Sequence, residues 1–333
     1  MRHYFFRRLL QIIPVVFGIT ALVFFIMRLI PGDPALVLLG TDATPEDLAR
    51  MRETLGLNES LWTQFFSYIK NALTLDFGNS IFQKEAVMTI LLRSFPATLE
   101  LSVCAIIISL LIAVPLGVAA AVKRNTWIDY AGMTFAQLGT SMPVFWIGVL
   151  LIMYFSVHLG WLPSFGRGEP LTRGLGLLVT TGSPQVLLTG LKHILMPAFS
   201  LGVMGAALIS RMIRSSMLEV LDSDYIRTAR AKGTPEGKVV MKHAFRGALL
   251  PVVTTVGLQF GALLGNAIVT ETVFSWPGIG RVVVTAISQR DFPLVQGGVI
   301  LIALAFALIN MGVDLLYAVI NPKIRAGRER GAA

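Results

Sequence analysis

The chain has 333 residues, of which 54% are hydrophobic and only 14% are charged. A soluble domain of this length carries about 25% charged residues, so the composition excludes an ordinary soluble protein and favours one that crosses a membrane several times. The single cysteine, Cys104, excludes an intrachain disulfide bond.

Six apolar stretches are long enough to cross about 30 Å of hydrocarbon as helices. The first begins at Leu9 and ends at Ile30, which exceeds the ~7–15 residues of a signal-peptide apolar region, so we interpret it as a span and not as a cleaved leader. Pro143 predicts a helix break inside the third stretch. The stretches lie at 9–30, 99–122, 130–157, 190–212, 249–270 and 295–320.

The basic residues predict the orientation, because cytoplasmic loops of membrane proteins are enriched in Lys and Arg. With six spans, 17 of the 28 Lys and Arg residues fall on one side: in both terminal tails, the second-to-third loop and the fourth-to-fifth loop. Most acidic residues fall on the other side, between Asp33 and Glu85. We therefore expect both termini in the cytoplasm, and we attribute the net charge of +9 to topology and not to nucleic acid.

The outer segment between the first two spans is too long for a simple hairpin. Thr44 to Gly56 has the N-cap, the proline and the terminal glycine of a short helix. Leu61 to Gly78 is amphipathic and aromatic, which predicts a helix on the membrane surface or packed on the spans.

The basic stretch DYIRTARAKGTPEGK, Asp224 to Lys238, separates the fourth span from the fifth. It predicts a cytoplasmic helix of about ten residues that ends at Gly233. A phosphate-binding loop is excluded, because its glycines are one residue too close and Val239 replaces the required Ser or Thr. The helix is either a docking element for a soluble partner or an interfacial helix that meets anionic lipid. Its predicted apolar face consists of Leu218, Leu221, Tyr225 and Ala229.

Polar residues within the spans have two explanations, interhelical packing or the lining of a pathway. They are Gln137, Thr140 and Ser141 in the third span, and Gln259 and Asn266 in the fifth. Glu100, in the second span, either pairs with a basic residue or contacts the charged N-terminus of a peptide. The four histidines are dispersed and have no metal-binding spacing, so we predict no metal site.

The motif R-T-A-x-x-x-G resembles the E-A-A-x-x-x-G loop of binding-protein-dependent ABC importer permeases. Arg227 and Thr228 replace the Glu and the first Ala of the general pattern, and the form DYIRTARAKG is typical of the peptide and nickel branch. Further matches to that branch extend over nearly the whole chain. They are RRLLQIIPVVFGIT, RLIPGDP, SFPATLEL, SMPVFW, RSSMLEVL, HAFRGALLPVVT, ETVFSWPGIGR and DLLYAVINPKIR.

The resemblance implies an all-α permease subunit of the type I ABC importer fold in a bacterial inner membrane. Its implied partners are a homologous second permease subunit, two cytoplasmic ATPase subunits and a periplasmic or lipid-anchored binding protein. The implied substrates are short peptides, dipeptides first, with oligopeptides, glutathione or nickel as alternatives. The chain itself would hydrolyse nothing and hold no cofactor, because ATP and Mg²⁺ would bind to the ATPases.

On this reading the chain divides into a tail and first span over 1–30, an outer helical segment over 31–95, a permease core over 96–322 and a cytoplasmic tail over 323–333. The core contains a coupling loop over 213–248, whose helix would dock in the ATPase. The coupling residues that the resemblance implies are Leu221, Asp224, Tyr225, Arg227, Thr228, Ala229, Lys232 and Gly233. The candidates for the pathway are Glu100, Gln137, Ser141, Gln259 and Asn266.

Two other classes of protein make different predictions. A self-sufficient secondary transporter predicts inverted repeats and coupling-ion carboxylates deep in the membrane, and neither is evident in the sequence. A membrane enzyme predicts catalytic spacing, which is also absent.

Overall fold

The computed structural model describes residues 2–29, 33–40, 43–54 and 56–320, so the predicted tail over 323–333 lies outside the described residues. Within these ranges the elements are helices, and strand-like pairing is limited to an isolated antiparallel bridge between Asn79 and Ala86. This follows from the solvent, because a helix satisfies its own backbone polar groups where no water is available. The all-α prediction is confirmed.

Among the described residues, five helical stretches are long and apolar enough to cross a membrane. They confirm the first, second, fourth, fifth and sixth predicted spans. They are α1 (Arg2–Leu29), α5 (Val87–Val122), α9 (Gln185–Leu221), α12 (Phe245–Val273) with the turns that precede it, and α14 (Phe292–Ile320).

The third predicted span is not one helix. It is a pair, α6 (Trp127–Ser141) followed by α7 (Val144–Leu151) and the π-helical turn η1 (Ile152–His158), bent by 100°. The bend falls at Pro143, whose ring nitrogen has no hydrogen to donate, and the residue before it adopts an extended conformation. The break was therefore predictable from the proline, although its angle was not.

The described residues form two compact units. The first contains the chain up to Thr98 together with Pro277–Ala307, and the second contains Leu99–Trp276 together with the residues from Leu308 on. Helices α5 and α14 contribute residues to both units.

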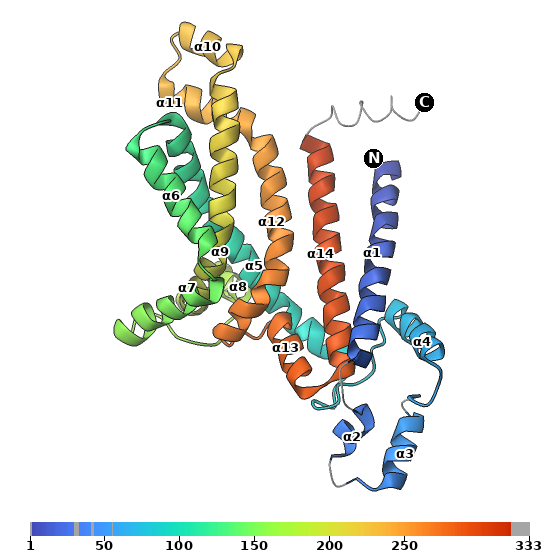
Figure 1. The fold of residues 1–333 in the computed structure, drawn as a ribbon. Coiled ribbons are helices and arrows are strands. Elements are labelled where there is room, and N and C mark those ends of the chain that lie inside the picture. Colours follow the sequence, from blue (N-terminus) through green and yellow to red (C-terminus); the bar gives the residue numbers. More distant parts are fainter. Residues whose placement is uncertain (1, 30–32, 41–42, 55, 321–333) are drawn as a thin grey trace. The chain divides into compact units, whose positions relative to one another are not determined.

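In the first unit, α1 packs with the first turns of α5 and α14 and with α13 (Ile279–Gln289). The outer helix α4 (Leu61–Leu73) lies against α1 (Figure 1), where buried Phe65 meets Phe24 at a centroid distance of 5.3 Å. The predicted packing of this amphipathic segment on a span is confirmed. The short helices α2 (Pro34–Leu39) and α3 (Pro45–Thr54) precede it, and the backbone N–H of Asp47 donates to the N-cap hydroxyl of Thr44.

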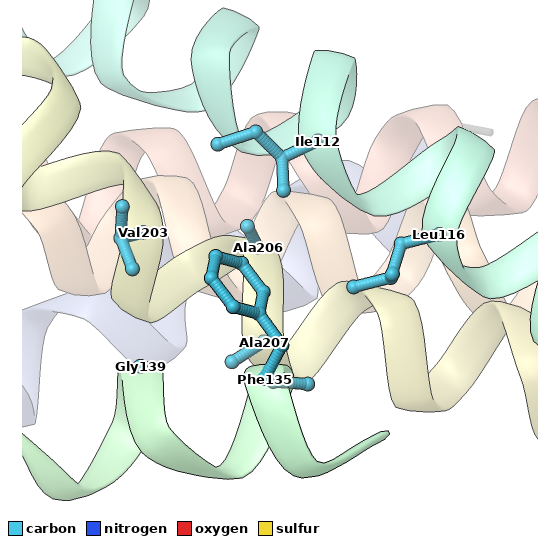
Figure 2. Close-up of a pocket in the computed structure, with 8 residues that line it drawn as sticks. Ile112, Leu116, Phe135, Gly139, Val203, Ala206 and Ala207 are labelled. Carbon is cyan, nitrogen blue, oxygen red and sulfur yellow. The ribbon is translucent and has the colours of Figure 1, made fainter. Parts of the chain in front are cut away.

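In the second unit, α9 is the central helix, and 67% of its most apolar stretch is buried. It packs against α12, α6, α7 and α8 (Leu171–Thr181). It also contacts α5, where the hydroxyl of Ser109 donates to the Gly202 carbonyl at 2.6 Å. Figure 2 shows how α5, α6 and α9 meet around a residual cavity of about 10 Å³, which is too small for a ligand. Its labelled lining residues are Ile112, Leu116, Phe135, Gly139, Val203, Ala206 and Ala207.

Glycines permit these close approaches. A Cβ atom on Gly117 of α5 would lie 2.7 Å from the Ser210 carbonyl oxygen and 2.8 Å from the Ile213 Cβ. A Cβ atom on Gly202 of α9 would lie 2.7 Å from the Ala105 carbonyl oxygen. Backbone atoms cannot rotate away, so α5 and α9 would have to separate.

We predict that Gly117→Ala lowers the stability of the folded chain by about 1–3 kcal/mol, because the added methyl group forces α5 away from α9. The matched control is Gly265→Ala, since a Cβ there meets no atom within 4 Å. Thermal unfolding of the purified chains in detergent would show a lower midpoint for Gly117→Ala alone. Equal midpoints would contradict the tight α5–α9 contact.

Candidate functional site

The segment between the fourth and fifth spans forms the short helix α10 (Asp224–Ala231), beyond the end of α9 (Figure 1). Asp224 occupies its first turn, where a negative charge suits the helix dipole. The backbone of Ser223 is extended as at an N-cap, but its hydroxyl donates to the Val220 carbonyl instead of capping the helix.

The C-terminal end of α10 is fixed by Gly233. This residue has φ = +74°, a left-handed conformation that glycine adopts without strain. Its N–H donates to the Arg230 carbonyl at 2.9 Å, and the N–H of Thr234 donates to the Ala229 carbonyl at 3.2 Å. These two bonds make a Schellman motif, so the predicted helix end at Gly233 is confirmed.

The predicted apolar face requires a correction. Ile226, which the sequence analysis left out of that face, is fully buried and anchors α10 among Met217, Val239 and Ala244. Leu218, Leu221 and Ala229 are partly buried and pack on this same cluster, whereas Tyr225 is 50% exposed. Most of the apolar face is therefore used inside the chain. The exposed surface of α10 is polar and carries Asp224, Tyr225, Arg227, Thr228 and Arg230, with Lys232 just beyond.

After α10 the chain turns back into the fifth span through α11 (Glu236–Lys238) and the π-helical turn η2 (Val239–Ala244). Arg230 closes this turn with two hydrogen bonds to the Glu236 carboxylate, at 2.7 and 3.1 Å. The same hydrogen bonds raise the pKa of the Arg230 guanidinium. An open hollow of about 330 Å³ lies beside it, lined by Tyr225, Lys242, His243, Arg246 and Gly247.

Two of the predicted pathway residues lie together on α6, and the structure adds a third. Ser141 donates to the Gln137 backbone carbonyl at 3.0 Å, and the Gln137 side-chain oxygen accepts from Arg211 of α9 at 3.0 Å. All three side chains are exposed on the second unit. We call Gln137, Ser141 and Arg211 the polar face. Arg211 was not among the predicted pathway residues, although its place near the end of an apolar stretch was a usable signal.

The remaining pathway candidates are not joined to the polar face by any recorded hydrogen bond. Gln259 is half-buried and Asn266 is exposed, both on α12. The Glu100 carboxylate pairs with Arg167 and accepts the backbone N–H of Leu171, so the predicted pairing with a basic residue is present. These bonds tie the loop before α8 to α5 and leave Glu100 only 10% exposed. We therefore interpret Glu100 as a structural tie.

A second ion pair joins α6 to α9. The Asp129 carboxylate, only 3% exposed, accepts two hydrogen bonds from Arg214, at 2.6 and 2.7 Å. This pair was not predicted from the sequence, because its members are 85 residues apart and no local pattern links them. In the part of the chain that the structure describes, no cluster of three His, Cys, Asp or Glu side chains could hold a metal ion.

Comparison with known proteins supplies the family. Residues 113–326 match the family described as the inner membrane component of binding-protein-dependent transport systems, and residues 1–102 match the N-terminal family of such membrane components. The dipeptide transport system permease protein DppB of Alkalihalophilus pseudofirmus is 47% identical over 98% of this chain and all of its own length. The glutathione transport system permease protein GsiC of Salmonella choleraesuis is 43% identical over 98% of this chain and 99% of its own.

Among solved structures, an inward-facing form of the MetNI methionine ABC transporter matches with a TM-score of 0.56 and 19% identity, covering 70% of this chain and 97% of its own. At this identity the likeness concerns the fold alone, and it agrees with the predicted importer permease fold. The chain is a multi-pass membrane protein that belongs to the family of inner membrane components of binding-protein-dependent transport systems.

Proposed function

We propose that this chain is the transmembrane permease subunit of an ABC importer that moves dipeptides across the bacterial inner membrane. The observation that carries the proposal is the 47% identity to a dipeptide permease over its full length. The glutathione permease, at 43%, carries a peptide of three residues, so short peptides are the common class. Nickel and glutathione are the alternatives that the uptake experiment below tests, and longer peptides are a further alternative.

The proposed mechanism places all ATP chemistry on two partner ATPase subunits, which hold ATP and Mg²⁺. The polar surface of α10 docks in one of them, and a homologous second permease supplies the other half of the pathway. A periplasmic or lipid-anchored protein delivers the peptide. Both termini and α10 then lie on the cytoplasmic side, in agreement with the basic residues of the loops.

The residues that α10 exposes support docking on a soluble partner and not burial in the lipid interface. Its one fully buried apolar side chain, Ile226, points into this chain, and its free surface offers charged and hydroxyl groups with a single tyrosine. An interfacial helix would instead turn its apolar side outward to the acyl chains. The exposed Gln137, Ser141 and Asn266 and the half-buried Gln259 are proposed to line the pathway, because polar side chains on spans are costly against lipid.

Uptake of a labelled dipeptide tests the function. Cells with the gene for this chain deleted should lose most of the uptake, and plasmid-borne wild-type chain should restore it. An excess of unlabelled dipeptide should compete, whereas nickel and glutathione should not. Undiminished uptake in the deletion strain would reject the dipeptide assignment, and competition by nickel or glutathione would move the substrate to that ligand.

The coupling role predicts a strong effect of Gly233→Val. A β-branched residue in the left-handed conformation costs about 1–2 kcal/mol, so the last turn of α10 should shift and uptake should fall about tenfold. The matched control is Gly237→Val, because a Cβ at either position meets nothing within 4 Å and only Gly233 has a positive φ. Uptake and the amount of chain in the membrane are measured together. Wild-type uptake by Gly233→Val would exclude α10 from coupling.

A further inference from the structure

One guanidinium on α9 has no acidic partner among the described residues. Arg211 makes its recorded hydrogen bond to the neutral amide of Gln137, and none of the recorded ion pairs includes it. One turn further on, Arg214 is neutralised by both oxygens of Asp129. Two arginines three residues apart on one helix therefore differ in whether an acidic side chain neutralises them. Arg214 ties α6 to α9, and Arg211 keeps an uncompensated positive charge.

The uncompensated charge lies at the end of the predicted fourth span. Arg211 is the last residue but one of the apolar stretch 190–212, and its partner Gln137 is ten residues, about 15 Å, on from Trp127, where α6 begins. Long side chains on a helix point toward the helix N-terminus, so the Arg211 side chain points along the apolar part of α9, away from α10.

A charge beside an apolar stretch is costly against lipid, so we expect the polar face to meet water or another protein. Ser141, exposed on the same side of α6, extends the face by one further turn. The amide of Gln137 uses one of the five guanidinium N–H groups of Arg211 and fixes its direction. The remaining guanidinium donors can bind an oxyanion, and a carboxylate fits two of them side by side.

We propose that Arg211, oriented by Gln137, binds the C-terminal carboxylate of the peptide as it passes through the permease. The inference rests on the proposed function and assigns Arg211 as a specificity-determining residue within it. The carboxylate is the one negative group that every dipeptide of neutral side chains carries at neutral pH. When the peptide carboxylate leaves water, charge-assisted hydrogen bonds to Arg211 replace the hydration that the carboxylate loses.

The first arm of the test measures transport by the whole complex, purified through a tag on this chain and reconstituted in vesicles with ATP. Arg211→Gln should lower the maximal rate of alanyl-alanine uptake at least tenfold, while KM, which delivery by the separate binding protein sets, should stay unchanged. Arg211→Lys should restore part of the rate because it keeps the charge. Lys123→Gln, which removes one exposed charge from a cytoplasmic loop, should transport as the wild type does.

A second variant guards against a folding defect. Gln137→Glu leaves Arg211 in place and neutralises it with a neighbouring carboxylate, which strengthens the α6–α9 contact. It should therefore assemble normally and still lose uptake at least tenfold. Uptake at the wild-type rate by Gln137→Glu, or by assembled Arg211→Gln, would overturn the assignment of Arg211.

The second arm tests whether the polar face is accessible to water. In a Cys104→Ala background, Ser141→Cys provides one thiol for a water-soluble maleimide. We expect the maleimide to label this thiol, and we expect alanyl-alanine to slow the labelling at least fivefold during turnover. In the Arg211→Gln variant, alanyl-alanine should no longer slow the labelling. An unlabelled thiol, or protection that survives Arg211→Gln, would overturn the inference alone. Absence of dipeptide uptake by wild-type vesicles would overturn the proposed function and this inference together.

Discussion

The close approach of α9 to its neighbours is the constraint on which the second unit depends. Lipid offers no hydrophobic driving force between helices, so association relies on van der Waals contact and on a few hydrogen bonds. Gly117 and Gly202 bring the α5 and α9 backbones together, and the hydroxyl of Ser109 joins them where they meet. A helix held this closely cannot separate from its neighbours without opening voids between them.

Charged groups in this bundle are of two kinds: those paired with an opposite charge of the same unit, and those without such a partner. The partner, and not the residue type, tells the two kinds apart. Glu100 and Asp129 are charged groups with little exposure, and each is satisfied by an arginine of the same unit. Such pairs tie helices and loops together and leave nothing free for a ligand. Arg211 carries the same chemistry on the same helix as Arg214, yet its recorded partner is neutral. Arg211 therefore keeps donors that this chain does not use, which is why we propose a ligand for it.

Local signals made much of the fold predictable. The lengths of the apolar stretches predicted the spans. Pro143 predicted the break between α6 and α7, and Gly233 predicted the end of α10. The contacts that define the site were not predictable in this way, because they join distant residues. Arg214 and Asp129 are 85 residues apart, and Arg167 and Glu100 are 67 apart. Ile226 was missed for a related reason. Its burial depends on the π-helical turn η2 folding back over α10, which no period within α10 reveals.

The two ends of the proposed mechanism lie on consecutive helices, α9 and α10. Arg211 lies on α9 ten residues before its last residue, and α10 follows after only two more residues. Ile226 locks α10 to the same core that holds the end of α9 and the start of the fifth span, so α10 cannot swing independently. A displacement of α10 would then pass into α9 and shift Arg211, ten residues before the end of α9. Closely packed elements of this kind switch between discrete arrangements. A transporter needs two such arrangements in order to expose one binding site first to one side of the membrane and then to the other.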